Sequence, residues 1–119
     1  MEFNFEKLIV YQKSLDYVDF VYEITKNYPS AEKISLVDQF RRAATSIALN
    51  IGEGSSGTKK EFINFLRISA RSLRECVVCT TISYRMKYID NETFEKSRQL
   101  LTEISKLNSG LTNSLKKVL

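Results

Sequence analysis

The sequence contains no histidine and no tryptophan among its 119 residues, and it has only one proline, two cysteines and four glycines. The absence of histidine excludes Ser-His-Asp and Cys-His hydrolase sites, HExxH metalloprotease sites and histidine proton shuttles. No apolar run approaches the roughly 18 residues of a membrane-spanning helix, and residues 1–4 lack the basic and then apolar signature of a signal peptide. We therefore expect a cytoplasmic protein that is not an enzyme, needs no cofactor and does not enter a membrane.

The two cysteines, Cys76 and Cys79, have the spacing of a CxxC motif. A redox-active pair of this kind belongs to a βαβ unit, whereas these two lie inside a helical pattern. Zinc prefers four ligands, and the chain offers no histidine and no second cysteine pair, so a zinc site would require a symmetric partner. We expect both cysteines to be small core residues without a metal or a disulfide.

Apolar residues repeat at alternating three- and four-residue steps in four segments, the spacing that places side chains on one face of a helix. In the first segment, residues 5–27, the stripe consists of Phe5, Leu8, Tyr11, Leu15, Val18 and Tyr22. This helix should end before Pro29, because proline disfavours helical geometry in the preceding residue. The second, shorter stripe consists of Leu36, Phe40, Ile47 and Ile51. It leads to residues 52–57, where three glycines should permit a sharp reversal of the chain.

The third helix should begin at Thr58, whose hydroxyl can form a capping box with Glu61. Its stripe, which runs to about residue 88, consists of Phe62, Leu66, Leu73, Val77 and Tyr84. Residues 90–92 can cap a fourth helix, and its stripe consists of Phe94, Leu101, Ile104, Leu107, Leu111, Leu115 and Val118. The sequence predicts an all-α fold in one domain, residues 1–119. That fold is an antiparallel up-and-down four-helix bundle with long third and fourth helices.

The first helix carries a second apolar set, Ile9, Phe20 and Ile24, displaced by roughly a quarter turn or more from the main stripe. An additional apolar face of this kind predicts contacts with another subunit. The alternative is that one wide stripe packs against two neighbouring helices of the same bundle. We predict a homo-oligomer in which these three residues form subunit contacts.

Positive charge gathers in residues 58–88, which hold seven Lys or Arg and two acidic residues. Five of these cations fall within a sector of roughly 60° on the third helix; this basic stripe consists of Lys60, Arg67, Arg71, Arg74 and Arg85. A planar guanidinium can bind phosphate oxygens bidentately, so the stripe predicts binding to a nucleic-acid backbone. The alternatives are a solvated helix face or ion pairs between subunits, and Glu75 has the spacing to pair with Arg71.

The second helix has a polar face made by Gln39, Arg42, Ser46, Asn50 and Glu53. Such a row of hydrogen-bonding groups can cross-link helices or subunits, and its last two members lie where they could hold the glycine-rich turn. A catalytic role would need a nucleophile or a perturbed acid beside them. We therefore predict a structural role for this face.

The glycine-rich turn has the GxxxxG spacing of a phosphate-binding loop and is followed by Thr58 and Lys59. A nucleotide hydrolase needs the lysine before the threonine and a strand before the glycines, and neither condition is met. The first amides of the third helix, with Lys59 and Lys60, could still hold a phosphate without catalysis.

The stretch QFRRAATSIALNIGEG, residues 39–54, resembles the family named for proteins encoded in intervening sequences of bacterial 23S rRNA genes. The similarity covers nearly the whole chain and includes Phe5, Leu8, Tyr11, Gln12, Tyr28, Pro29, Glu32, Glu61, Phe62, Phe65 and Leu66. Two departures are visible. Gly52 stands where the family usually has alanine, and Arg71 stands where a glycine is common.

This resemblance implies an antiparallel four-helix bundle that assembles as a barrel-like homopentamer, and it implies no reaction. The family is similar to the accessory variability protein of diversity-generating retroelements, a basic pentamer implicated in binding nucleic acid and reverse transcriptase. The predicted function is therefore a non-enzymatic homo-oligomer that binds RNA or DNA with low specificity through the basic stripe. The alternative is an adaptor that docks a protein partner and has no nucleic-acid ligand.

Overall fold

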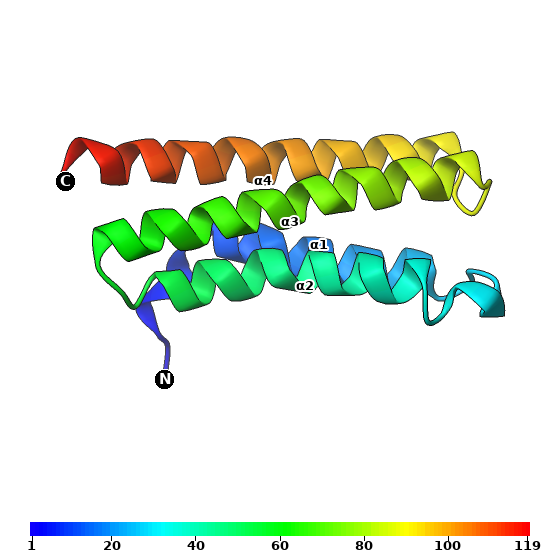
Figure 1. Cartoon of the computed structure of the whole chain (residues 1–119), viewed down its shortest axis with the longest axis horizontal. Coiled ribbons are helices and arrows are strands. Elements are labelled where there is room, and N and C mark those ends of the chain that lie inside the picture. The colour runs from blue at the N-terminus through cyan, green and yellow to red at the C-terminus, as the bar shows by residue number, and fades with distance from the viewer.

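The computed structural model describes the whole chain, residues 1–119, and consists of four helices packed side by side (Figure 1). The helices are α1 (Ile9–Thr25), α2 (Leu36–Gly54), α3 (Lys59–Arg85) and α4 (Asn91–Lys117), with short 3-10 turns η1 (Asn4–Lys7) and η2 (Ser30–Glu32). No strand is present, and α3 and α4 are the longest elements, with 27 residues each. The predicted all-α fold with long third and fourth helices is confirmed.

The chain runs up and down the bundle (Figure 1). Both termini lie at the same end as the connection from α2 to α3, and the other two connections lie at the opposite end. Each helix packs on two neighbours, α2 between α1 and α3, and α4 between α3 and α1. The resulting rod measures 46 × 26 × 22 Å. None of the helices has an apolar stretch long enough to cross a bilayer.

The predicted caps of the last two helices are present. Before α3, the Glu61 backbone N–H donates to the Thr58 hydroxyl at 3.1 Å, and the Glu61 carboxylate accepts from the Thr58 N–H at 2.8 Å. Before α4, the carboxylate of Asp90 accepts from the Thr93 N–H at 2.8 Å. These hydrogen bonds lower the pKa of Glu61 and of Asp90 below their ordinary values. The Glu61 carboxylate thus places a negative charge at the start of α3, beside the amides considered for a phosphate, and it bonds to the Thr58 N–H rather than to those of Lys59 and Lys60.

The first helix is shorter than predicted, because residues 4–7 form the separate turn η1. The Glu6 carboxylate accepts from the Phe3 N–H at 2.8 Å and closes this turn. Leu8 then has an extended backbone, with φ −68° and ψ 126°, and α1 begins at Ile9. The predicted single helix over residues 5–27 is therefore wrong at its start.

The buried face of α1 is also not the predicted stripe. The buried residues are Val10, Ser14, Tyr17, Val21 and Thr25. Leu15 and Tyr22, from the predicted stripe, are 41% and 43% exposed. The spacing of apolar residues predicted the wrong face because three of the buried residues carry hydroxyl groups. Two of these bond within the helix, where Ser14 donates to the Val10 carbonyl and Thr25 to the Val21 carbonyl, both at 2.7 Å.

The third of these hydroxyls belongs to a buried network that joins three helices. The Tyr17 hydroxyl of α1 and the Thr80 hydroxyl of α3 each lie 2.8 Å from the Ser97 hydroxyl of α4. Burial raises the pKa of Tyr17 well above its ordinary value, so its phenol stays protonated and can donate. A satisfied network of this kind fixes how the helices are paired.

The two cysteines lie next to this network, and both are free and buried. Burial raises the pKa of the Cys79 thiol to about 11 and that of Cys76 still higher. Both side chains are therefore protonated at neutral pH, which leaves them unreactive as nucleophiles. No group of three or more His, Cys, Asp or Glu residues lies together in a way that could hold a metal ion.

The other predicted stripes agree with the structure except near the ends of α3 and α4. All four members of the second stripe are buried, and the core members of the last two stripes are Leu66, Leu73, Leu101 and Ile104. Tyr84 is 38% exposed. Its ring lies at the edge of the bundle and packs on Phe94, with 4.5 Å between the ring centroids. Val118 follows the end of α4 and is 58% exposed.

The turn between α2 and α3 does not depend on glycine flexibility, because no glycine in the chain has a positive φ. The prediction of a glycine-driven reversal is wrong. Two serine hydroxyls hold the turn instead, from Ser55 to the Gly52 carbonyl at 2.8 Å and from Ser56 to the Glu53 carbonyl at 2.9 Å. Gly54 serves a different purpose, since a Cβ there would lie 2.5 Å from the Cβ of Phe65. It lets α2 and α3 approach closely.

Candidate nucleic-acid interface

All five members of the basic stripe are exposed on α3. The three ion pairs of the chain involve other cations: Lys13 with Glu103 at 3.4 Å, Lys26 with Glu23 at 2.8 Å, and Arg42 with Asp38 at 3.8 Å. In particular, Arg71 forms no ion pair with Glu75, although the spacing would allow one. The stripe thus presents charges that this chain does not neutralise.

The structure brings four members of the stripe together and sets the fifth apart. Lys60, Arg67, Arg71 and Arg74 follow one another over residues 60–74 of α3. Arg85 lies about 16 Å beyond Arg74, at about 1.5 Å per residue. The face between them carries Val78 and Ile82, which are 57% and 42% exposed. The continuous part of the stripe is therefore its first four residues.

Helix α4 adds cations that the sequence pattern did not identify. Arg67 of α3 and Lys116 of α4 line one groove of about 340 Å³ between these helices. Arg98 and Lys106 of α4 line a second groove of about 350 Å³. No acidic residue lines either groove. Only the packing of α4 against α3 reveals this extension, because residues 89–119 carry almost equal numbers of cations and anions.

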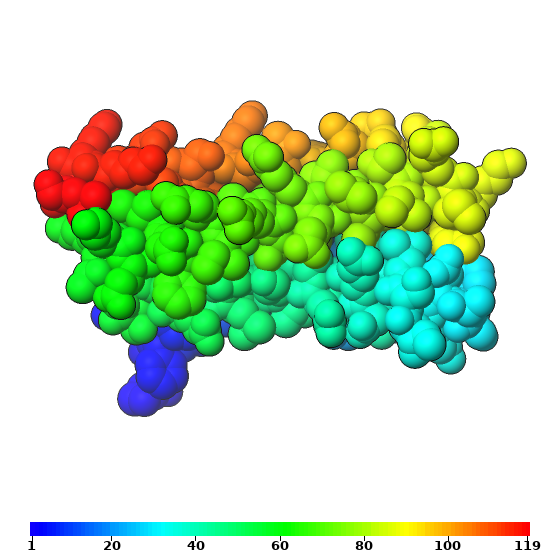
Figure 2. Space-filling view, viewed as in Figure 1, coloured from blue at the N-terminus to red at the C-terminus, as the bar shows by residue number.

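On the opposite side of the stripe, a polar groove of about 420 Å³ separates α3 from α2 (Figure 2). We use the name polar groove for the hollow lined by Ile34, Ser35, Asp38, Gln39, Arg42, Ala43, Ser46, Ser72 and Glu75. The Ser72 hydroxyl of α3 donates to the Ser46 hydroxyl of α2 at 2.7 Å. This bond connects the two helices beneath the groove.

The polar face predicted on α2 is divided between two surroundings. Gln39, Arg42 and Ser46 line the polar groove. Asn50 donates to the Ser46 carbonyl at 2.8 Å and to its hydroxyl at 3.0 Å. Glu53 is exposed and lines a different groove, between α1 and α2. Neither the Asn50 nor the Glu53 side chain forms a hydrogen bond with the glycine-rich turn, so these two residues do not hold the turn as predicted.

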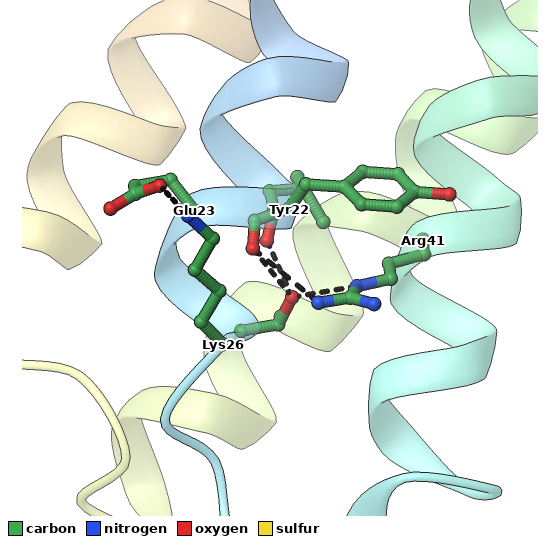
Figure 3. A network of polar contacts seen from close by, with 6 residues as sticks. Tyr22, Glu23, Lys26 and Arg41 are labelled. Atoms are coloured by element: carbon green, nitrogen blue, oxygen red, sulfur yellow. Dashed lines mark hydrogen bonds and ion pairs between the residues drawn. The ribbon is translucent and has the colours of Figure 1, made fainter.

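Arg41, the residue before Arg42, is held against α1 (Figure 3). Its Nε donates to the Thr25 hydroxyl at 2.9 Å, and its Nη2 donates to the Tyr22 carbonyl at 3.4 Å. Its guanidinium also lies 4.5 Å from the centroid of the Tyr22 ring. Arg41 therefore joins α2 to the C-terminal end of α1, where the helix dipole stabilises a positive charge. Sequence reasoning did not single it out.

The groove between α1 and α2, which we call the apolar groove, has a volume of about 650 Å³. Its apolar and aromatic lining consists of Phe3, Phe5, Tyr11, Leu15, Val18, Ala48 and Leu49. Most of these side chains belong to the stripe that the sequence assigned to the core. The N-terminal residues beside it project from the bundle (Figures 1 and 2).

The predicted subunit contacts are not equally available on the surface of α1. Ile9 is 60% exposed. Phe20 and Ile24 are half-buried and pack on the core of their own bundle, where the Phe20 ring stacks on Tyr17 with 5.8 Å between centroids. The apolar groove exposes more apolar side chains than this second set does.

The sequence matches the model of a known protein family. Residues 6–110 match the model of the 23S rRNA-intervening sequence protein family. The chain belongs to this family. The resemblance of residues 39–54 to it is thereby confirmed.

A solved member of the same fold shows that the bundle is not peculiar to this sequence. It is a protein with unknown function from the S23 ribosomal protein family of Bacteroides thetaiotaomicron, known from its crystal structure. It is 28% identical to this chain and superposes with a TM-score of 0.81, over 88% of this chain and 96% of its own. No curated protein matches the chain. The comparisons thus establish a family and a fold whose function is unknown.

Proposed function

We propose that this 23S rRNA-intervening sequence protein is a non-enzymatic homo-oligomer that binds the backbone of RNA or DNA with low sequence specificity. The observation that carries the proposal is the set of exposed cations over residues 60–74 of α3, none of which has an acidic partner in the chain. Phosphate oxygens would supply the missing negative charge, and Arg67, Arg71 and Arg74 can bind them bidentately.

The cations of α4 support the same function. Lys116 beside Arg67, and Lys106 with Arg98 one groove further, widen the stripe into a surface that spans two helices. No recognised base-reading motif accompanies these cations, so contacts to phosphate would dominate the affinity. Because such contacts release counterions, the affinity should fall steeply as the salt concentration rises.

Assembly would multiply this surface. The apolar groove supports self-association, because apolar side chains gathered on a surface gain free energy when a partner covers them. The family resemblance favours five copies. In a ring of that kind, each copy would present its own stripe, and several weak phosphate contacts would act together on one nucleic acid.

The test is fluorescence anisotropy with labelled structured RNA, single-stranded DNA and duplex DNA at several salt concentrations. The test variant reverses three charges, Arg67→Glu, Arg71→Glu and Arg74→Glu. The control variant reverses three exposed cations elsewhere, Lys7→Glu, Lys33→Glu and Lys96→Glu, so that both variants change the net charge equally. Wild type and control should bind with a steep negative salt slope, and the test variant should lose most of its affinity.

Light scattering of the same samples separates binding from assembly. The proposal requires the test variant to keep the mass of the wild-type oligomer while its affinity for nucleic acid falls. Unchanged binding by an intact test oligomer would sink the assignment, as would a wild-type protein that binds no nucleic acid at low salt.

The second candidate function is an adaptor for a protein partner, and the apolar groove is the observation that favours it. In that case the arginines of α3 would form ion pairs between subunits. The test variant would then break the oligomer before it affected any ligand, and a pull-down would recover the protein partner after nuclease treatment.

A further inference from the structure

The two sides of the basic stripe differ in charge. On the side of α4, the grooves contain cations and no acidic residue. On the side of α2, the polar groove contains Asp38 and Glu75 together with amide, hydroxyl and guanidinium groups. Phosphate would therefore bind on the stripe and toward α4, whereas the polar groove suits a ligand that is neutral and rich in hydrogen-bonding groups.

Several groups in the polar groove have free hydrogen-bonding capacity. The Glu75 carboxylate forms no ion pair, and neither it nor the Gln39 amide forms a side-chain hydrogen bond within the chain. Arg42 is held only by Asp38, at 3.8 Å, and its side chain is 79% exposed. The serine pair below them is already bonded. The open positions are thus a carboxylate acceptor on α3 and amide and guanidinium donors on α2.

The polar groove lies directly beside the stripe. Arg71 and Glu75 are one turn apart on α3, and residues at this spacing have Cβ atoms about 5–6 Å apart. A single strand carries its phosphates along one edge and its unpaired bases on the other. A strand that follows Arg67 and Arg71 therefore directs its bases toward either α4 or α2. The grooves beside α4 offer amide and hydroxyl oxygens, and only the groove beside α2 offers carboxylates, which can accept two parallel donors of a base at once.

We propose that the polar groove accepts an unpaired guanine base from a single strand whose phosphates lie on Arg67 and Arg71; this rests on the proposed function. Guanine presents two parallel donors, N1–H and the N2 amino group, which match the two oxygens of the Glu75 carboxylate. Its O6 and N7 can accept from the Gln39 amide or from Arg42. The volume of about 420 Å³ falls within the range of small-ligand pockets.

The other bases fit the carboxylate less well. Adenine and cytosine each offer one amino group beside a ring nitrogen that repels the second oxygen. Uracil offers one N–H between two carbonyl groups. In a duplex, the N1–H and amino group of guanine are already bonded to cytosine. The polar groove therefore favours single strands that contain guanine, by about tenfold for one bidentate contact.

The test compares labelled RNA strands of equal length and charge at one salt concentration, using the full chain. The strands are (UUG)4, (UUA)4, (UUC)4 and U12, with a hairpin in which every guanine is paired. We expect (UUG)4 to bind about tenfold more tightly than the other single strands and than the hairpin. Glu75→Gln replaces one acceptor oxygen with a donor and should reduce the (UUG)4 affinity to that of U12.

The matched control is Glu95→Gln, which makes the same change in charge at an exposed position in the first turns of α4. It should keep the preference for guanine. If all strands and the hairpin bind equally to the wild type, or if Glu75→Gln keeps the preference, the guanine site is refuted while backbone binding stands. If no strand binds at low salt, the proposed function fails together with this inference.

Discussion

The two sides of α2 are packed in different ways. Toward α3 the second half of α2 is closed, with Gly54 against Phe65 and with the Ser69 hydroxyl donating to the Ile47 carbonyl at 3.0 Å, and the polar groove borders only its first half. Toward α1 the same helix borders the apolar groove of about 650 Å³, and there a Cβ on Gly52 would meet the Phe5 ring at an ordinary 3.5 Å. Gly54 and Ser69 bring the helices together on the first side, whereas aromatic and aliphatic side chains make up about half of the lining on the second.

This difference assigns different tasks to the two sides. The close contact of Gly54 and Ile47 with α3 holds the helix that carries the basic stripe. The open side leaves apolar surface that a partner chain can cover. A change that disturbs the closed side should therefore cost stability, whereas a change of similar size on the open side should cost little.

The largest effect is expected for Gly54→Ala. The added methyl group would lie 2.5 Å from the Phe65 Cβ and 3.1 Å from the Phe62 ring, and a Cβ cannot move aside without its backbone. We expect a loss of about 2–3 kcal/mol in the free energy of unfolding, as for other overpacked cores. Urea unfolding followed by circular dichroism measures it. A variant as stable as the wild type would show that the two helices separate freely, and the comparison would fail.

The next effect is expected for Ser69→Ala, which removes a buried hydrogen bond between α3 and α2. We expect a loss of about 1 kcal/mol, the net contribution of a typical hydrogen bond. The control is Thr45→Ala on the open side, where the hydroxyl bonds only to the Arg41 carbonyl of its own helix at 2.8 Å. It should change the stability by less than about 0.5 kcal/mol. If both variants lose the same free energy of unfolding, the hydrogen bond between α3 and α2 contributes no more to stability than one within a helix.

The same contrast explains what the sequence could and could not predict about the fold. The buried face of α2 is aliphatic and aromatic, so its periodicity gave the correct stripe. The buried face of α1 includes Ser14, Tyr17 and Thr25, whose hydroxyls are satisfied only in the folded structure. A pattern of apolar residues cannot count such positions as core, and it therefore selected the neighbouring stripe that borders the apolar groove.

The candidate site shows the same limit. The five cations of the basic stripe lie on one helix, so the sequence alone placed them on one face. Lys116 and Lys106 join them only because α4 packs beside α3, and the polar groove exists only between two helices. Groups on one element are predictable from spacing, whereas a site shared by two elements requires their packing.

A smaller effect of opposite sign is expected for Gly52→Ala on the open side. Alanine is favoured over glycine inside a helix, and the new methyl group meets only ordinary contacts with Phe5 and Tyr11. We expect a gain of about 0.5–1 kcal/mol. Gly110→Ala in α4 is the reference, since nothing lies within 4 Å of its Cβ. If Gly52→Ala lowers the free energy of unfolding while Gly110→Ala raises it, the apolar groove tolerates no added volume.

The smallest effect concerns pH at the connection from α2 into α3, on the closed side. Backbone and hydroxyl hydrogen bonds at Thr58 lower the pKa of Glu61, so the ionised carboxylate stabilises the folded chain. This contribution is complete above the unfolded pKa and is lost as the pH falls through the lower folded pKa. Glu61→Gln should therefore be less stable than the wild type at about pH 7, and the difference should shrink toward about pH 3. Urea midpoints across this range measure the trend, with Glu95→Gln as a control without a cap. A difference that stays constant with pH would show that the charge of Glu61 adds nothing to the capping box.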